Sequence, residues 1–188
     1  MPQVETFWLR DDGLVPNNGT VPLVVYRAAF PSAEGSAAAI QRHFERNGWS
    51  NGWVNGIFPF HHYHPDCHEV LGVAAGSALV QFGGASGPVV RVERGDAVLV
   101  PAGVGHCCHE QTPDLVVVGA YPGGASWTTE RATPEARARS LPIIAGIAPP
   151  PADPVTGASH PIWSCPDGVG QGDGCAHDRG LAQNMRSK

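Results

Sequence analysis

Three residues with metal-binding side chains lie close together in the first half of the chain. His62 and His64 are two residues apart, so on an extended strand both imidazoles leave the same face. A Pro-Asp pair after them favours a turn, and Glu69 then begins the next stretch with strand character. Because the chain folds back at that turn, we expect two imidazoles and one carboxylate to converge on one point.

A fourth donor is expected from a second stretch, Gly95–His106. A short apolar strand in this stretch ends in a turn that contains Pro101 and Gly103. The turn places His106 at the start of the following strand. The second stretch can therefore add a third imidazole to the same point.

The combined donor set indicates a transition metal site. Three neutral imidazole nitrogens and one carboxylate oxygen suit Fe, Mn, Ni, Zn or Co better than Ca or a soft-metal thiolate site. Four protein ligands leave one or two positions of a five- or six-coordinate ion for water or substrate, as catalysis requires. We predict one divalent transition metal ion, whose identity the sequence does not give. Its predicted ligands are His62, His64, Glu69 and His106.

Neighbouring residues leave alternatives open. His61 has the opposite strand parity and His68 lies in the turn, so both are expected at the surface or behind the ligands. A turn shorter by one residue would put His68 in the place of Glu69. Glu110 shares the face of His106, and it either lines the cavity as a proton acceptor or faces solvent. Glu69 and Glu110 are the candidate catalytic residues. Without metal, the four donors would be polar residues at a barrel mouth.

The chain has five cysteines, an odd number that argues against a disulfide framework. Alternation places Cys107 outward and Cys108 inward, and apolar packing is the expectation for both. A redox role or a substrate contact is the alternative for Cys108. The spacing of Cys165, Cys175 and His177 is looser than that of zinc fingers, so we interpret this trio as incidental.

The two histidine-bearing stretches resemble the paired motifs of the cupin superfamily. The first motif spaces a glycine, a His-x-His pair, a carboxylate and a second glycine; the second spaces two glycines around a proline and ends in a histidine. The matching residues are Gly56, His62, His64, Glu69 and Gly76 in the first motif and Gly95, Pro101, Gly103 and His106 in the second. The family usually has Asn where this chain has Glu110, which leaves the metal ligands intact but not the usual hydrogen-bond partner.

A narrower resemblance, from about Thr6 to Trp163, is to the bacterial cupins of the YjlB type. It rests on the segments Phe44–Trp49, His61–His64, His68–Gly72 and Ala152–Val155. The resemblance implies a jelly-roll β-barrel, a bound divalent metal ion and frequent homodimers. It implies no substrate, because cupins include dioxygenases, isomerases, decarboxylases, storage proteins and ligand-sensing domains.

Short strands separated by glycine are expected to hold the donors in place. Their regular spacing predicts an all-β sandwich or barrel, and with the resemblance a jelly-roll cupin barrel whose core spans about 57–121. The expected strands are Val21–Tyr26, Glu69–Ala74, Ala78–Phe82, Val89–Glu93, Ala97–Pro101, Gly105–Glu110 and Leu115–Tyr121.

Two helices and one loop are expected outside the barrel core. Ser36–Asn47 has a capping serine, and Ile40 and Phe44 are spaced to share its buried face. Thr133–Ser140 predicts a short C-terminal helix with proline in its first turn. The glycines, asparagines and tryptophans of Gly48–Gly56 indicate a loop or a short hairpin.

Length and composition indicate the class of protein. The chain of 188 residues fits one domain, predicted over residues 1–163 and followed by a flexible, glycine-rich tail at 164–188. The net charge of −5 and the absence of a basic patch argue against nucleic-acid binding. No signal peptide or apolar membrane span is visible, so we expect a cytoplasmic protein without a membrane partner.

Two functional hypotheses follow. The first is a metal-dependent enzyme, of the oxygenase or isomerase type, that acts on a small polar molecule inside the barrel. The second is a non-catalytic sensor or storage module that binds a metal or metabolite. A metal-free sugar epimerase of cupin fold is less favoured, because Glu69 completes the metal set. A homodimer is expected from the family resemblance and from edge strands that need covering.

Overall fold

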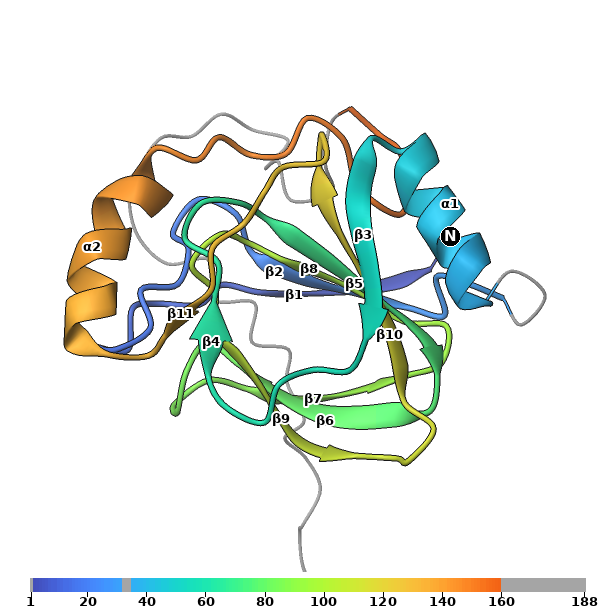
Figure 1. Cartoon of the computed structure of the whole chain (residues 1–188), viewed down its shortest axis with the longest axis horizontal. Coiled ribbons are helices and arrows are strands. Elements are labelled where there is room, and N and C mark those ends of the chain that lie inside the picture. Colours follow the sequence, from blue (N-terminus) through green and yellow to red (C-terminus); the bar gives the residue numbers. More distant parts are fainter. Residues whose placement is uncertain (1, 32–34, 160–188) are drawn as a thin grey trace, which may run out of the picture.

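The computed structural model describes residues 2–31 and 35–159. Two antiparallel sheets pack face to face, with one helix on each side of the molecule (Figure 1). In spatial order, the larger sheet contains β1 (Gln3–Phe7), β2 (Leu23–Arg27), β8 (Ala97–Val100), β5 (Glu69–Ala75), β10 (Val116–Pro122) and β3 (Trp49–Asn55). The smaller contains β11 (Glu130–Arg131), β4 (His62–Tyr63), β9 (His106–Gln111), β6 (Ser77–Phe82) and β7 (Val89–Glu93). The helices are α1 (Ala37–Arg46) and α2 (Pro134–Ala145).

The six-stranded sheet is buried on both faces. Along β2, Leu23 and Val25 belong to the apolar cluster between the two sheets, whereas Val24 and Tyr26 belong to the cluster that also contains the buried residues of α1. This alternation is what a strand with two covered faces requires. The predicted all-β jelly-roll barrel with two helices is therefore confirmed.

The α1 helix matches its prediction closely. Ser36 caps its N-terminus, because its Oγ accepts a hydrogen bond from the Ala39 N–H over 3.3 Å. Ile40 and Phe44 are fully buried, as their spacing predicted. A Cβ at Gly72 of β5 would lie only 2.7 Å from Ile40 Cγ2, so glycine lets the helix pack directly on the sheet.

The prediction of a loop or short hairpin at Gly48–Gly56 is wrong. These residues contain β3, which pairs along β10 at the edge of the larger sheet. Asn51 adopts a left-handed φ of 55°, and the β3–β10 register shifts between Gly119 and Tyr121. These irregularities let a segment with turn-like composition still form a strand, because pairing with β10 outweighs local preference.

Other departures concern the ends of the chain. The helix α2 continues past the predicted end at Ser140 and through Pro142, because Ala136, Ser140 and Ile144 form one buried face at intervals of four residues. The edge strands β1 and β11 were not predicted.

The predicted boundary at residue 163 and the tail 164–188 lie outside the described residues. Among those that are described, no helix has the length and apolarity to span a membrane.

Candidate metal centre

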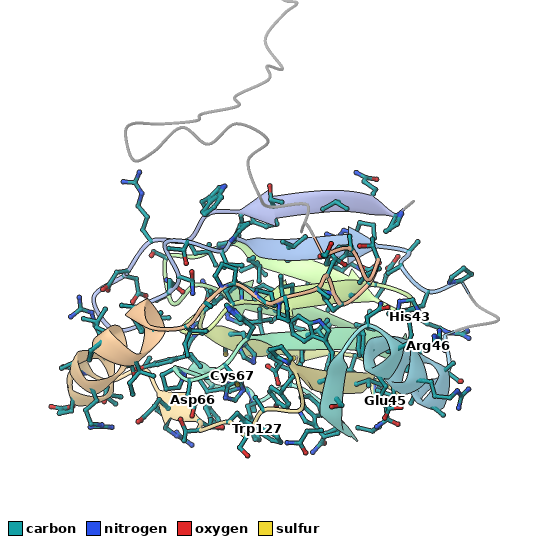
Figure 2. All side chains as sticks on the ribbon, turned by 90° about the horizontal axis from the view of Figure 1, so that it is seen from above. His43, Glu45, Arg46, Asp66, Cys67 and Trp127 are labelled. Atoms are coloured by element: carbon teal, nitrogen blue, oxygen red, sulfur yellow. The ribbon has the colours of Figure 1, made fainter. Side chains whose placement is uncertain are left out.

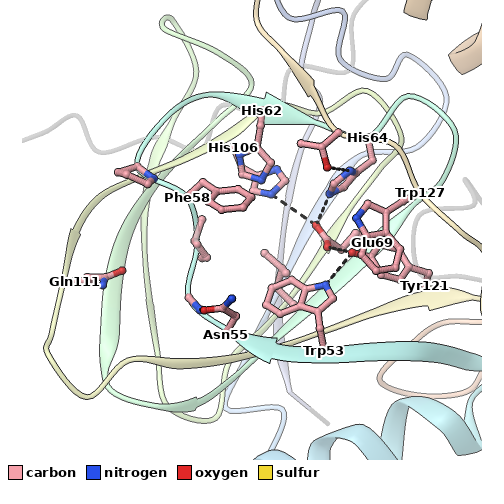
Figure 3. A pocket seen from close by; sticks show the side chains of 15 residues that line it. Trp53, Asn55, Phe58, His62, His64, Glu69, His106, Gln111, Tyr121 and Trp127 are labelled. Carbon is pink, nitrogen blue, oxygen red and sulfur yellow. Dashed lines mark hydrogen bonds and ion pairs between the residues drawn. The ribbon is translucent and has the colours of Figure 1, made fainter.

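The predicted ligand side chains meet between the two sheets (Figure 3). His62 of β4 lies directly opposite His106 of β9, and their ring centroids are 4.0 Å apart. His64 follows just after β4 and joins them, so one side-chain nitrogen from each of the three residues lies within 4.8 Å of the other two. The same-face argument from the sequence therefore places all three imidazoles correctly.

Glu69 approaches the imidazoles of His64 and His106 from the opposite sheet, at the start of β5. Its Oε2 lies 3.5 Å from His64 Nε2 and 3.6 Å from His106 Nε2. All three side chains are at most 7% exposed. The structure thus brings together the four side chains that the sequence predicted as metal ligands.

Each histidine is oriented by a main-chain carbonyl oxygen at Nδ1. The three Nδ1 contacts are His62 with Phe60 O at 3.1 Å, His64 with Thr128 O at 2.7 Å and His106 with Val104 O at 3.4 Å. A carbonyl oxygen only accepts hydrogen bonds, so Nδ1 carries a proton and, in the neutral ring, the Nε2 lone pair is free. This is the usual arrangement for metal-binding histidines.

Glu69 is held on one side only. Tyr121 donates its hydroxyl proton to Oε1 of Glu69 over 2.7 Å, and Trp53 Nε1–H donates to the Tyr121 oxygen over 2.8 Å. The other carboxylate oxygen, Oε2, is buried and has no hydrogen-bond partner in the described part of the chain. A buried anionic oxygen without a partner is costly. A divalent cation between Oε2 and the three Nε2 atoms would satisfy it, so these residues fit a metal ion.

The electrostatics of the centre favour an anionic Glu69 and neutral imidazoles at His62 and His106. Burial alone would raise the pKa of Glu69, but His64, His106 and Tyr121 lower it to about 2. Burial lowers the pKa of His106 to about 3 and also lowers that of His62. Burial opposes the charged form of His64 as well, yet the adjacent Glu69 carboxylate raises its pKa overall. Glu69 is therefore an anion, and His62 and His106 are neutral donors.

A cavity of about 450 Å³ opens beside these four side chains (Figure 3). Its size falls in the usual range for small-molecule sites. The remaining lining is apolar and aromatic with a few polar groups, contributed by Trp53, Asn55, Gly56, Ile57, Phe58, Pro59, Leu71, Gln111, Tyr121, Trp127 and Thr129.

The alternative that His68 replaces Glu69 does not hold. His68 is 1% exposed and lies away from the cavity lining. Its Nδ1 accepts a hydrogen bond from the Ala102 N–H over 3.1 Å, and its Nε2 donates to Ala148 O over 3.0 Å. Both ring nitrogens are therefore used to join segments of the fold.

Of the two alternatives for Glu110, the structure fits the solvent-facing one, and the inward parity with His106 is wrong. Glu110 is exposed and does not line the cavity, whereas Gln111 does. The register between β6 and β9 shifts by one residue, because Val80 pairs with Cys108 but Leu79 pairs with Glu110. This bulge inverts the alternation after Cys108. Cys108 itself packs in the apolar cluster between the sheets, as expected.

Two tryptophans of the cavity were missed from the sequence. Trp53 lies in the segment interpreted as a loop, and Trp127 lies after β10 with no periodic pattern. Asp66 fixes the segment that contains Trp127, because its carboxylate accepts hydrogen bonds from the N–H and the hydroxyl of the neighbouring Thr128. Figure 2 shows Asp66 and Trp127 on the same side of the molecule. Trp127 stacks on Tyr121 with ring centroids 4.1 Å apart.

Comparison with known proteins places the chain in a family. The sequence profile of the cupin domain matches residues 53–118. An uncharacterised protein of Bacillus subtilis (strain 168), YjlB, is 40% identical over 160 residues, which cover 85% of this chain and 94% of that protein. The chain belongs to the YjlB-type cupins. The family resemblance inferred from the motifs is thereby confirmed.

Solved structures with related folds are much more distant from this cupin. Acireductone dioxygenase from Bacillus anthracis, with a cadmium ion in its active centre, is 19% identical with a TM-score of 0.38, covering 66% of this chain and 80% of that one. A cupin-like protein from Thermotoga maritima is 16% identical with a TM-score of 0.31, covering 73% and 82%. At such low identity the activity of neither protein transfers to this cupin.

Proposed function

We propose that this cupin is a metal-dependent enzyme that acts on a small molecule inside the barrel. One observation carries the proposal: three free Nε2 atoms and the unpartnered Oε2 of Glu69 converge beside the cavity. The proposed metal ligands are His62, His64, Glu69 and His106. A divalent ion held there would supply a Lewis acid with open positions for substrate.

The surrounding side chains have distinct tasks in this proposal. Tyr121 holds Oε1 of Glu69, so the carboxylate keeps Oε2 directed at the imidazoles. Trp53 supports Tyr121 from one side and Trp127 stacks on its ring. The two indoles also exclude water from the inner wall of the cavity, which strengthens electrostatic interactions there.

The cavity favours a compact substrate with polar ends and an apolar body. Apolar and aromatic walls dominate, while Asn55 and Gln111 add side-chain amides away from the imidazoles. No lysine or arginine is among the described lining residues, so an acidic substrate group would have to approach the metal itself. The expected substrate is therefore a small polar molecule with a metal-binding oxygen donor.

Within the enzyme hypothesis, the lining favours the oxygenase type over the isomerase type. Isomerisation by proton transfer needs a side-chain base or acid beside the substrate. Apart from the four proposed ligands, Tyr121 is the one described lining residue that can ionise. Burial and the nearby Glu69 raise its pKa, and its proton is donated to Glu69. Glu110, the candidate proton acceptor, is outside the cavity.

The second candidate function is a non-catalytic sensor or storage module. The same shortage of proton-transfer groups favours it, because binding needs none. A thermal-shift screen of small polar metabolites against metal-loaded protein separates the two functions. An enzyme converts the stabilising compound, with oxygen uptake in the oxygenase case, whereas a sensor returns it unchanged.

The direct test of the enzyme proposal starts with metal content. We expect purified protein to hold one equivalent of a transition metal at the centre and to lose it in the His106→Ala variant together with turnover. Protein that carries no stoichiometric metal, and turns over a substrate as fast after His106→Ala, would overturn the proposal.

The remaining expectations about partners are part of the same proposal. A cytoplasmic homodimer without nucleic-acid or membrane partners stays a prediction. The exposed Val54 of β3 and Val89 of β7 lie on edge strands that a second copy could cover. Elution at the volume of a dimer would support this, and elution as a monomer would remove it.

A further inference from the structure

A second group of metal-binding side chains lies on the other face of the strands that carry His62 and His106. His61 directly precedes β4, and Cys107 directly follows His106 in β9. His109 is two residues further along β9. One potential ligand atom from each of His61, Cys107 and His109 lies within 4.8 Å of the other two. We call this group the outer cluster.

Gln81 of β6 joins the two imidazoles of the outer cluster. Its Oε1 lies 3.2 Å from His61 Nε2 and 3.0 Å from His109 Nε2. Its amide group donates to Ala85 O over 2.9 Å and to Gly87 O over 3.2 Å, which fixes the direction of the oxygen. Both rings therefore contact one oxygen, and it belongs to the β6 residue that pairs with Cys107.

An unpartnered buried atom marks this cluster as well. In residues 2–31 and 35–159, only two buried side-chain nitrogen or oxygen atoms lack a hydrogen-bond partner. One is Oε2 of Glu69 in the interior centre, and the other is Nδ1 of His61. Such atoms in a native fold call for a water, an ion or a functional explanation. Each of the two clusters contains one.

We propose that His61, Cys107 and His109 form a second metal site, on the outside of the barrel, that binds a zinc-class divalent ion. Two imidazoles and one thiolate form a donor set typical of zinc. Because Gln81 Oε1 accepts the Nε2–H of both imidazoles, their Nδ1 lone pairs are free for the metal, and water would fill the fourth position. On binding, the metal–sulfur bond forms, the S–H bond breaks and the proton passes to solvent.

The geometry requires only a small closing movement. Ligand atoms around a tetrahedral zinc ion lie roughly 3.5 Å apart, given bonds of about 2.0–2.3 Å. In this structure the three ligand atoms lie no more than 4.8 Å apart. His109 is exposed and can swing, whereas Cys107 is buried and anchored in β9. The described cavity does not extend to these residues. The site therefore stabilises the sheet by joining β9 to the chain just before β4.

Cobalt(II) provides a test that separates the two sites. A cobalt–thiolate bond gives a charge-transfer band in the near ultraviolet, whereas the proposed interior ligands contain no sulfur. The full-length chain with Cys165→Ser and Cys175→Ser provides the background, so that these thiols cannot contribute. We expect two equivalents of cobalt to bind and the band to appear.

Variants on this background assign the band. Cys107→Ser should remove it, and His109→Ala, at an exposed position, should weaken the corresponding affinity at least about tenfold. Glu110→Ala is the matched control on the same strand and should change nothing. His62→Ala should leave the band intact while it weakens cobalt binding at the interior centre.

Two results would overturn the second site. One is a background protein that shows no charge-transfer band at saturating cobalt. The other is a band that survives in both the Cys107→Ser and the His109→Ala variants at unchanged affinity. Circular dichroism of each variant confirms that a lost band does not come from a lost fold. Because His62→Ala reports on the interior centre alone, failure of one site is distinguishable from failure of the other.

Discussion

The inner and outer faces of β4 and β9 use consecutive residues for different chemistry. His62 and His106 point into the barrel, while their neighbours His61 and Cys107 lie on the opposite face. Inside, nitrogen and oxygen donors lie beside a cavity. Outside, a thiol replaces the carboxylate and no described cavity adjoins the cluster. Strand alternation thus lets two strands carry one donor set beside the cavity and another on the outside of the barrel.

The two faces also differ in how firmly their imidazoles are held. Each interior histidine contacts a main-chain carbonyl oxygen, which moves only with the fold. The outer histidines share one side-chain oxygen, from Gln81. Groups fixed by the backbone lose less freedom on binding. We therefore expect the interior centre to bind metal more tightly than the outer cluster.

The largest expected effect separates the two faces at adjacent residues. His106→Ala removes an interior ligand and should weaken interior metal binding by more than the about 10–100-fold typical of a supporting residue. Cys107→Ser should leave interior binding unchanged. Metal titration of both variants followed by calorimetry measures the difference. Equal losses in the two variants would show that the faces do not act separately.

The next effect concerns the support of Glu69. Tyr121→Phe removes the hydroxyl that donates to Oε1, so interior metal affinity should fall about 10–100-fold although every ligand remains. The orphaned oxygen should also lower the free energy of unfolding by about 1–3 kcal/mol.

Tyr63→Phe is the matched control for Tyr121→Phe. Its hydroxyl is buried as well but bonds Ser140 instead of a proposed ligand. It should change stability and leave metal affinity alone. If Tyr121→Phe loses stability only, in the same way as Tyr63→Phe, then Tyr121 does not position Glu69 for metal.

A smaller effect tests the bulge in β9. Gln111→Ala removes an amide from the cavity and should weaken binding of the compound found by thermal shift about fivefold, the equivalent of one hydrogen bond of about 1 kcal/mol. Glu110→Ala should have no effect, because that side chain is outside the cavity. Ligand titrations measure both. If ligand affinity fell in Glu110→Ala and not in Gln111→Ala, Glu110 would face the cavity, and the bulge in β9 would be contradicted.

The smallest effect lies far from both clusters. Arg137 of α2 forms hydrogen bonds with Asp11 that lower the pKa of this carboxyl group in the folded state. A carboxyl group whose pKa is lower in the folded state stabilises the fold at pH values above its unfolded-state pKa. This contribution disappears as the pH falls through the folded-state pKa. Asp11→Asn should therefore lower Tm slightly at neutral pH and not at strongly acidic pH. Thermal denaturation across pH tests this, and a difference that grows towards acid would contradict it.

The sequence predicted the interior donors well because their placement depends on local rules. Because His62 and His64 are two residues apart, they share one face of the strand. Turns then determine where the later ligands, Glu69 and His106, lie. Gly76, between β5 and β6, and Gly103, in the turn before His106, adopt φ angles of 68° and 84°, which glycine accepts most easily. Local spacing and turn chemistry are therefore sufficient for this part of the site.

The features that were missed depend on contacts between distant segments. The bulge at β9 redirects Glu110, and only its pairing with β6 reveals it. The strand β3 has turn-like composition and exists because β10 pairs with it. Trp127 reaches the cavity because its neighbour Thr128 is tied to Asp66. None of these pairings has a local periodic signal.

The central claim is that one divalent ion lies between His62, His64, Glu69 and His106. Anomalous diffraction from crystals of the metal-loaded protein, recorded on both sides of the metal's absorption edge, tests it most directly. We predict an edge-dependent peak within about 2.0–2.3 Å of the three Nε2 atoms and of Oε2 of Glu69. A map without a peak there, from protein that contains stoichiometric metal, would contradict the account.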